Sequence, residues 1–144
     1  MPYDERFITP MRQELVRLGV QEMRTADEVE ETLGEAKEPT LLVVNSMCGC
    51  AARNARPGVA MALAQAAKKP AKLTTVFAGQ DVEATARARD YIHGYPPSSP
   101  SIALLKDGQL VHMIERWQIE GRSAQMIADD LARAFDQHCA TSNV

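Results

Sequence analysis

The sequence predicts an α/β fold in which a central mixed β-sheet of about four strands is sandwiched by α-helices. Helical and strand patterns alternate along most of the chain, and strands joined by helices pair in parallel. An Asp-Gly pair between two apolar runs near the C-terminal end adds an antiparallel hairpin. The sheet is therefore expected to be mixed, with helices on both faces.

Two helices precede the first strand. Across residues 10–18, Met11, Leu15 and Leu18 recur at helical spacing before a glycine. The second helix begins at Thr25, where a Thr and a Glu three residues apart form the pattern of a capping box. We interpret both helices as scaffold.

The first strand leads directly to a pair of cysteines. Residues 40–45 form a continuous apolar run, which is typical of a strand buried on both faces of a sheet. An alanine-rich helical segment follows at residues 51–69, but Pro57 lies inside it. We expect that helix either to kink at Pro57 or to restart there, with the proline in its first turn.

The second half of the chain continues the alternation of strand and helix. The expected elements are a strand at 72–78, a helix at 81–93, an irregular proline-rich segment at 95–100, a hairpin of residues 102–105 and 110–114, and a helix at 123–138. No repeat or change of composition divides the chain. We expect a single domain over residues 1–144, with N-terminal helices in 1–38 and a core with the active site in 39–139.

Composition excludes several classes of function. The 144 residues are 45% hydrophobic and 24% charged, with 16 basic and 19 acidic side chains and a net charge of −3. No basic cluster is present to bind nucleic acid or an anionic membrane, and no apolar run reaches the roughly 18 residues of a membrane helix. The start of the chain lacks the pattern of a secretory signal. We therefore expect a cytoplasmic protein without nucleic-acid or membrane partners.

The cysteines point to redox chemistry. A chain of this length buries about 70% of the surface that it exposes when unfolded, so it folds without disulfides, and cytoplasmic thiols stay reduced. Cys48 and Cys50 lie where the buried strand ends and a helix begins, and the helix dipole and free backbone amides there favour a thiolate. We assign Cys48, nearer the strand and more exposed, as the attacking thiol and Cys50 as the resolving thiol.

The single glycine between the cysteines permits a disulfide. Two Cα–Cα steps of about 3.8 Å allow up to roughly 7 Å between the two residues, whereas a disulfide needs about 5.5 to 6 Å. Gly49 supplies the permissive backbone that so small a ring needs. Because the ring is stiff, we expect an easily reduced, oxidising pair suited to exchange of mixed disulfides.

Two other interpretations of the cysteines are possible. Free cysteines are often simply small buried apolar residues. Alternatively, Met47, Cys48 and Cys50 could be soft ligands of a thiophilic metal ion, although two cysteines without a second pair make an incomplete site. The three histidines show no ligand spacing, and we predict no metal site.

Three segments resemble the bacilliredoxins, small bacterial proteins with a Cys-Gly-Cys centre. They are residues 45–58 (Asn-Ser-Met-Cys-Gly-Cys-Ala-Ala-Arg-Asn-Ala-Arg-Pro-Gly), residues 96–104 (Pro-Pro-Ser-Ser-Pro-Ser-Ile-Ala-Leu) and residues 114–121 (Ile-Glu-Arg-Trp-Gln-Ile-Glu-Gly). The likeness covers nearly the whole chain, and the first segment is specific. The resemblance implies a thioredoxin-like fold.

The resemblance also implies an activity. Cys48 would attack the mixed disulfide between a client protein's cysteine and the low-molecular-weight thiol bacillithiol, and Cys50 or free bacillithiol would then clear Cys48. The implied partners are S-thiolated client proteins and a small-thiol reductant, with bacillithiol or another small thiol as co-substrate and no tightly bound cofactor. Disulfide isomerisation at the same site is the alternative activity.

The resemblance further implies residues that support the site. In thioredoxin-like folds a cis proline precedes the strand that faces the cysteines, so we predict a cis Ser99-Pro100 bond and a substrate-facing loop there. Asn45 and Gly49 belong to the matching motif and are expected to support the active site.

The chain departs from ordinary thioredoxins in lacking a buried acid in the strand before the cysteines. Glu115, at the end of the last strand, is a candidate base for Cys50, against the plainer interpretation of a solvated edge charge. We expect Trp117 to be a half-buried packing residue and Cys139, at the end of the last helix, to be an incidental thiol.

Overall fold

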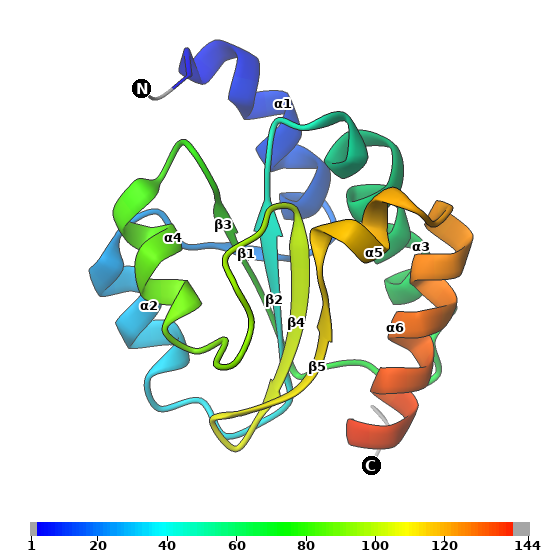
Figure 1. Cartoon of the computed structure of the whole chain (residues 1–144). Coiled ribbons are helices and arrows are strands. Elements are labelled where there is room, and N and C mark those ends of the chain that lie inside the picture. The colour runs from blue at the N-terminus through cyan, green and yellow to red at the C-terminus, as the bar shows by residue number, and fades with distance from the viewer. Residues whose placement is uncertain (1–2, 140–144) are drawn as a thin grey trace.

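The computed structural model describes residues 3–139, which form a five-stranded mixed sheet between two layers of helices (Figure 1). The strand order is β1-β3-β2-β4-β5. The strands are β1 (Gln21–Glu22), β2 (Thr40–Asn45), β3 (Lys72–Phe77), β4 (Ser101–Lys106) and β5 (Gln109–Ile114). Strands β1, β3 and β2 pair in parallel, and the β2–β4 and β4–β5 pairs are antiparallel. The predicted α/β class is confirmed. The sheet gains a fifth strand because β1 has only two residues, too few for a periodic pattern.

The central strand β2 is buried on both faces. Leu41 and Val43 pack into one core cluster, and Leu42 and Val44 pack into a second cluster on the opposite face. Successive side chains of a strand point to opposite faces, so a strand between two helical layers needs apolar residues at every position. This requirement explains the continuous apolar run in the sequence.

The helices form two layers, one on each face of the sheet (Figure 1). One layer consists of α2 (Ala26–Leu33) and α4 (Val82–Arg89), which contact each other. The other contains α3 (Arg56–Gln65) and α6 (Ala124–His138). The capping box predicted at Thr25 is present at the start of α2.

The first helix, α1 (Glu5–Val16), begins five residues earlier than the predicted start at residue 10. The Asp4 carboxylate accepts a hydrogen bond from the Arg6 amide, which caps the helix at that point. Pro10 lies inside the helix. A proline there removes only one intrahelical hydrogen bond, so it does not mark the helix start.

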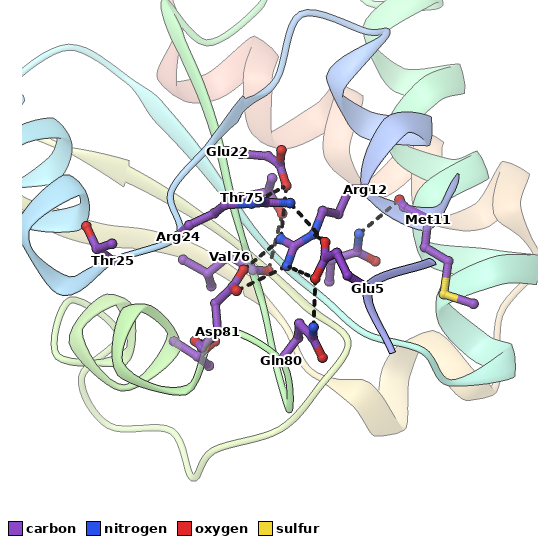
Figure 2. A network of polar contacts seen from close by, with 12 residues as sticks. Glu5, Met11, Arg12, Glu22, Arg24, Thr25, Thr75, Val76, Gln80 and Asp81 are labelled. Atoms are coloured by element: carbon purple, nitrogen blue, oxygen red, sulfur yellow. Dashed lines mark hydrogen bonds and ion pairs between the residues drawn. The ribbon is translucent and has the colours of Figure 1, made fainter. Parts of the chain in front are cut away.

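An ion-pair network around Arg12 fixes α1 to the sheet (Figure 2). The guanidinium donates to Glu5 of the same helix at 2.6 Å, to Glu22 of β1 at 3.0 Å and to Asp81, just before α4, at 2.6 Å. It also lies 5.4 Å from the centroid of the Phe77 ring. The network therefore joins the N-terminal helix to two neighbouring strands and the start of α4.

The hairpin and the helix restart agree with the sequence. Asp107 and Gly108 have φ angles of 53° and 73°, the left-handed conformations that a tight two-residue hairpin turn requires. A π-helix, η1 (Ala51–Ala55), precedes α3, and Pro57 lies in the first turn of α3. Of the two alternatives expected at Pro57, a kink or a restart, the structure shows the restart.

Three further features differ from the expectation, and the first is that the helix expected at 51–69 ends four residues earlier, as α3 at Gln65. The helix expected at 81–93 ends earlier, as α4, because residues 90–94 turn toward Gly94 with its φ of 86°. A short helix, α5 (Arg116–Glu120), follows β5 and was not predicted, since five residues show no helical period. Residues 1–2 and 140–144 of the expected single domain lie outside the described residues.

Candidate active site

Four loops meet at one end of the sheet. Asn45, the last residue of β2, pairs with Phe77 at the end of the parallel strand β3. Strand β4 runs the opposite way, so its beginning lies at the same end, as does the end of β5. The loops that meet are residues 46–50, 78–79, 99–100 and 115–116, and residues from all four line one pocket of about 280 Å³.

The two cysteines lie at the junction predicted from the sequence. Cys48 follows β2 and lines the pocket, whereas Cys50 is the cap residue of η1 and packs against the core cluster on the α3–α6 face. Both are free thiols and half-buried, and their Sγ atoms lie 2.8 Å apart. The thiol of one residue therefore hydrogen-bonds to the sulfur of the other.

The two thiols differ in acidity. Burial opposes ionisation of Cys48, but the hydrogen bond from Cys50, the backbone amides and the charge of Arg116 outweigh it and lower the pKa of Cys48. Burial raises the pKa of Cys50, and its hydrogen bond to Cys48 and the charge there raise it further. Cys48 is thus the more acidic thiol of the pair, which suits it to attack, and Cys50 is the better suited of the two to donate the hydrogen bond.

Arg116 is the charged side chain that acts on both sulfurs. It is the first residue of α5, its Nε donates to Glu120 at 2.6 Å, and its Nη1 donates to the Ser99 carbonyl at 3.3 Å. The Glu120 carboxylate and the two sulfurs raise the pKa of Arg116. Sequence reasoning missed this residue, although its place directly after the last strand, at the end of the sheet where the cysteines lie, was a usable signal.

Asn45, at the end of β2, holds the active-site loop through hydrogen bonds of its buried side chain. It is 1% exposed, so it does not contact a substrate. Its Oδ1 accepts hydrogen bonds from the Ser46 amide and from Arg56 Nη1, both at 2.9 Å, and its Nδ2 donates to the Met11 carbonyl at 3.3 Å. Ser46 Oγ in turn accepts from the Cys48 amide at 3.1 Å. Asn45 thus holds the backbone of Ser46, and the Ser46 hydroxyl in turn holds the backbone of Cys48.

Arg56 is a second residue that sequence reasoning missed. Its side chain is buried, its Nη1 also donates to the Ser46 carbonyl at 2.9 Å, and its Nε lies 3.2 Å from Glu14 Oε1. It therefore links α3 and α1 to the loop that precedes Cys48. Its place within the matching motif, ending at Gly58, was the available signal.

The predicted cis bond between Ser99 and Pro100 is confirmed. Pro100 is buried, and Ser99 lines the pocket beside Cys48. The Ser99 carbonyl accepts a hydrogen bond from Arg116, so the proline loop and α5 are held together at the edge of the pocket.

Gly49 differs from the expectation. Its backbone is not in the left-handed region, where other glycines of the chain lie. A Cβ at this position would approach the Arg53 guanidinium to 2.9 Å. In this dithiol form the glycine leaves room for the end of a flexible arginine side chain, and the permissive backbone we expected is not used.

Glu115 and Trp117 lie at the start of α5. Glu115 is its cap residue, and its carboxylate accepts a hydrogen bond from the Trp117 indole at 3.1 Å. A role of this carboxylate as base for Cys50 stays a prediction. Trp117 is 69% exposed, so the expectation of a half-buried packing residue was wrong. A short helix at the rim presents the indole to solvent.

The third cysteine belongs to the core. Cys139 is buried in the cluster between the sheet and the α3–α6 layer, and burial raises its pKa. A buried thiol of raised pKa is a poor nucleophile. Across residues 3–139, no group of three or more His, Cys, Asp or Glu side chains could hold a metal ion, and none of the helices described there is long and apolar enough to cross a membrane.

Comparison with known proteins identifies relatives over nearly the whole chain. The model of a family described as disulphide isomerase matches residues 3–139. A bacilliredoxin of Salinibacter ruber is 54% identical over 140 residues, covering 96% of this chain and 82% of the relative. One from Koribacter versatilis is 54% identical over 140 residues, covering 97% and 96%. One from Symbiobacterium thermophilum is 60% identical over 124 residues, covering 86% and 87%.

Solved structures with a similar fold include thioredoxins. The long form of spinach chloroplast thioredoxin f has a TM-score of 0.56 at 17% identity, covering 88% of this chain and 92% of that one. Fasciola hepatica thioredoxin has a TM-score of 0.53 at 17% identity, covering 83% and 99%. The fold is thioredoxin-like, as the resemblance implied. The bacilliredoxins are identical to this chain at about half or more of the aligned positions, and the alignments cover most of the chain. This chain therefore belongs to the bacilliredoxin family and is a thiol–disulfide oxidoreductase.

Proposed function

We propose that this protein reduces mixed disulfides between a cysteine of a client protein and the small thiol bacillithiol. The observation that carries the proposal is the asymmetric pair of thiols, in which Cys48 has a lowered pKa and the Cys50 sulfur lies 2.8 Å away. The similar proteins from three bacteria are named bacilliredoxins, which supports bacillithiol as the co-substrate.

In the first step the Cys48 thiolate attacks the bacillithiol sulfur of the mixed disulfide. The bond between that sulfur and the client sulfur breaks, and its electron pair leaves on the client sulfur, which takes a proton from water. The client is now reduced, and Cys48 carries bacillithiol through a new disulfide. The lowered pKa of Cys48 raises the fraction of thiolate available for this attack.

In the second step Cys50 clears Cys48. Once Cys48 is in a disulfide its charge is gone, which removes one cause of the raised pKa of Cys50. Cys50 then loses its proton to water and attacks the Cys48 sulfur. Bacillithiol leaves as a thiolate and is protonated, and a Cys48–Cys50 disulfide remains. A second bacillithiol can instead attack the bacillithiol sulfur on Cys48, which yields bacillithiol disulfide and free Cys48.

The shape of the site fits a small thiol bound beside a client loop. The pocket that Cys48 lines has a volume of about 280 Å³ and is bordered by Met47 and Ser99. This volume is near the lower end of the range of about 300 to 1,000 Å³ for small-molecule sites. The proposed partners are S-thiolated client proteins and a small-thiol reductant, and the proposed location is the reducing cytoplasm.

The test compares single-cysteine variants on a client protein that carries bacillithiol. Wild type releases bacillithiol, and Cys48→Ser abolishes the release because the attacking sulfur is missing. Cys50→Ser frees the client thiol in a single turnover but retains bacillithiol on Cys48 until free bacillithiol is added. Wild-type rates of release in both variants would show that the mechanism is wrong.

Disulfide isomerisation is the second candidate function, and the description of the matching family model as disulphide isomerase favours it. Cys48 would attack a disulfide of the client itself, and a client thiol would displace Cys48. Isomerisation does not need the resolving thiol, so Cys50→Ser would keep full activity on a client with scrambled disulfides. A wild-type rate on that client well below its rate on the bacillithiolated client would favour the first function.

A further inference from the structure

One cationic side chain lines the active-site pocket. Among residues 3–139, Arg116 is the only lining residue that carries a formal positive charge, and apart from the acidic thiol of Cys48 the remaining lining side chains are uncharged. The pocket therefore places one guanidinium beside the attacking sulfur. The Glu120 carboxylate pairs with this guanidinium at 2.6 Å from outside the pocket lining.

Two contacts fix the orientation of the guanidinium. Its Nε donates to Glu120, one turn later on α5, and its Nη1 donates to the Ser99 carbonyl. Within the part of the chain that the structure describes, its Nη2 has no hydrogen-bond partner. The remaining donor of this fixed guanidinium, Nη2, is suited to a hydrogen bond with a carboxylate.

The same charge also favours the anionic forms of Cys48 and Cys50. That effect acts on every substrate alike, because it changes the nucleophile and not the molecule under attack. A direct contact with the substrate acts differently, since it depends on the charge of the group that enters the pocket. The two roles therefore predict different results for small thiols of different charge.

We propose that Arg116 selects the small thiol, by pairing with a carboxylate of the small-thiol half of the mixed disulfide while Cys48 attacks its sulfur. The inference rests on the proposed function and adds that the preferred small thiols are acidic. The pocket is lined by Cys48, Ser99 and Arg116 together, and in the proposed complex the sulfur of the small molecule lies at Cys48 while its carboxylate lies at Arg116.

The test uses one client protein carrying three adducts of similar length: 3-mercaptopropionate, which is anionic, 2-mercaptoethanol, which is neutral, and cysteamine, which is cationic. For each adduct, kcat/KM is measured and divided by the rate of its reduction by dithiothreitol, which removes differences in intrinsic reactivity. We expect wild type to prefer the anionic adduct over the neutral one by roughly fivefold, the strength of a good partly exposed ion pair.

The variants distinguish selection of the small thiol by Arg116 from an effect of Arg116 on the pKa of Cys48. Arg116→Gln should abolish the preference for the anionic adduct, and Arg116→Glu should reverse it in favour of cysteamine. Arg53→Gln is the matched control, because Arg53 lies against Gly49 but does not line the pocket, and it should keep the wild-type preference. The preference should persist at a pH where Cys48 is fully ionised in every variant.

The outcomes are distinguishable. If Arg116→Gln slows all three adducts by the same factor, Arg116 acts only through Cys48 and the inference is overturned. A wild type that reduces the three adducts at equal normalised rates overturns the inference but leaves the proposed function intact. A wild type that releases no small thiol from any adduct, bacillithiol included, overturns both.

Discussion

The pKa values of Cys48 and Cys50 shift in opposite directions because the two thiols differ in a few contacts. Cys48 accepts a hydrogen bond from the Cys50 thiol, is stabilised by backbone amides and lies nearer the pocket, whereas Cys50 packs against the core and lies beside a developing negative charge. A shift of one pKa unit corresponds to about 1.36 kcal/mol, so contacts of ordinary strength suffice. The division of labour between attacking and resolving thiol thus follows from local geometry.

The hydrogen bond from Cys50 can be tested by its removal. Cys50→Ala deletes the donor, so the pKa of Cys48 should rise toward the ordinary cysteine value of about 8.5. Cys50→Ser keeps an O–H donor and should raise that pKa less. The measurement is the rate of alkylation by iodoacetamide against pH, and the curve of the Ala variant should lie at higher pH than that of the Ser variant. Superimposable curves for wild type and Cys50→Ala would contradict the assignment.

At the scale of elements, α1 is attached by charge as well as by apolar packing. The Arg12 side chain is 5% exposed and pairs with carboxylates from three separate segments. Beyond this network, Gln80 Nε2 donates to the Tyr3 carbonyl at 3.1 Å, and Tyr3 lines the active-site pocket. The N-terminal segment is therefore part of the pocket wall, although its sequence looks like scaffold.

Replacing Arg12 should destabilise the fold. Arg12→Met removes the shared partner of three carboxylates, which are 13 to 45% exposed, so the loss should be smaller than for a fully buried pair, about 1 to 3 kcal/mol of the free energy of unfolding. Urea denaturation measures the change. Arg6→Gln is the control, because the Arg6–Asp4 pair is exposed and its loss should leave the stability close to that of wild type. Equal effects of the two variants would show that the Arg12 network contributes little.

The contact of α3 with α6 depends on one glycine. A Cβ on Gly58 would lie 2.7 Å from Ile127 Cγ2 and 3.2 Å from the Ala124 carbonyl oxygen. Gly58→Ala should therefore lower the free energy of unfolding by about 1 to 3 kcal/mol through overpacking, even though alanine favours helix. Gly121→Ala, where the nearest atom is 3.9 Å away, should be close to neutral. A stabilised Gly58→Ala protein in thermal denaturation would contradict this packing account.

At the scale of the whole molecule, the site is assembled from loops that are distant in sequence and meet at one end of the sheet. Four of the five strands, the hairpin and the position of Cys48 and Cys50 were predictable because each depends on a local pattern, such as the apolar run of β2 or the Asp-Gly turn. Contacts of Arg116 with Ser99 and of Arg56 with Asn45 were not, because they depend on the register of strands and on how short helices lie at their ends. Short elements such as β1 and α5 were not predicted, because so few residues show no periodic pattern of apolar side chains.

The central claim is that Cys48 accepts the small thiol and Cys50 clears it. The most direct measurement is mass spectrometry of Cys50→Ser recovered from its native host, with peptide mapping of the added mass. The account predicts a single adduct with the mass of bacillithiol on Cys48, which disappears when a reducing agent is added. An unmodified Cys48, or an adduct found mainly on Cys139, would contradict it.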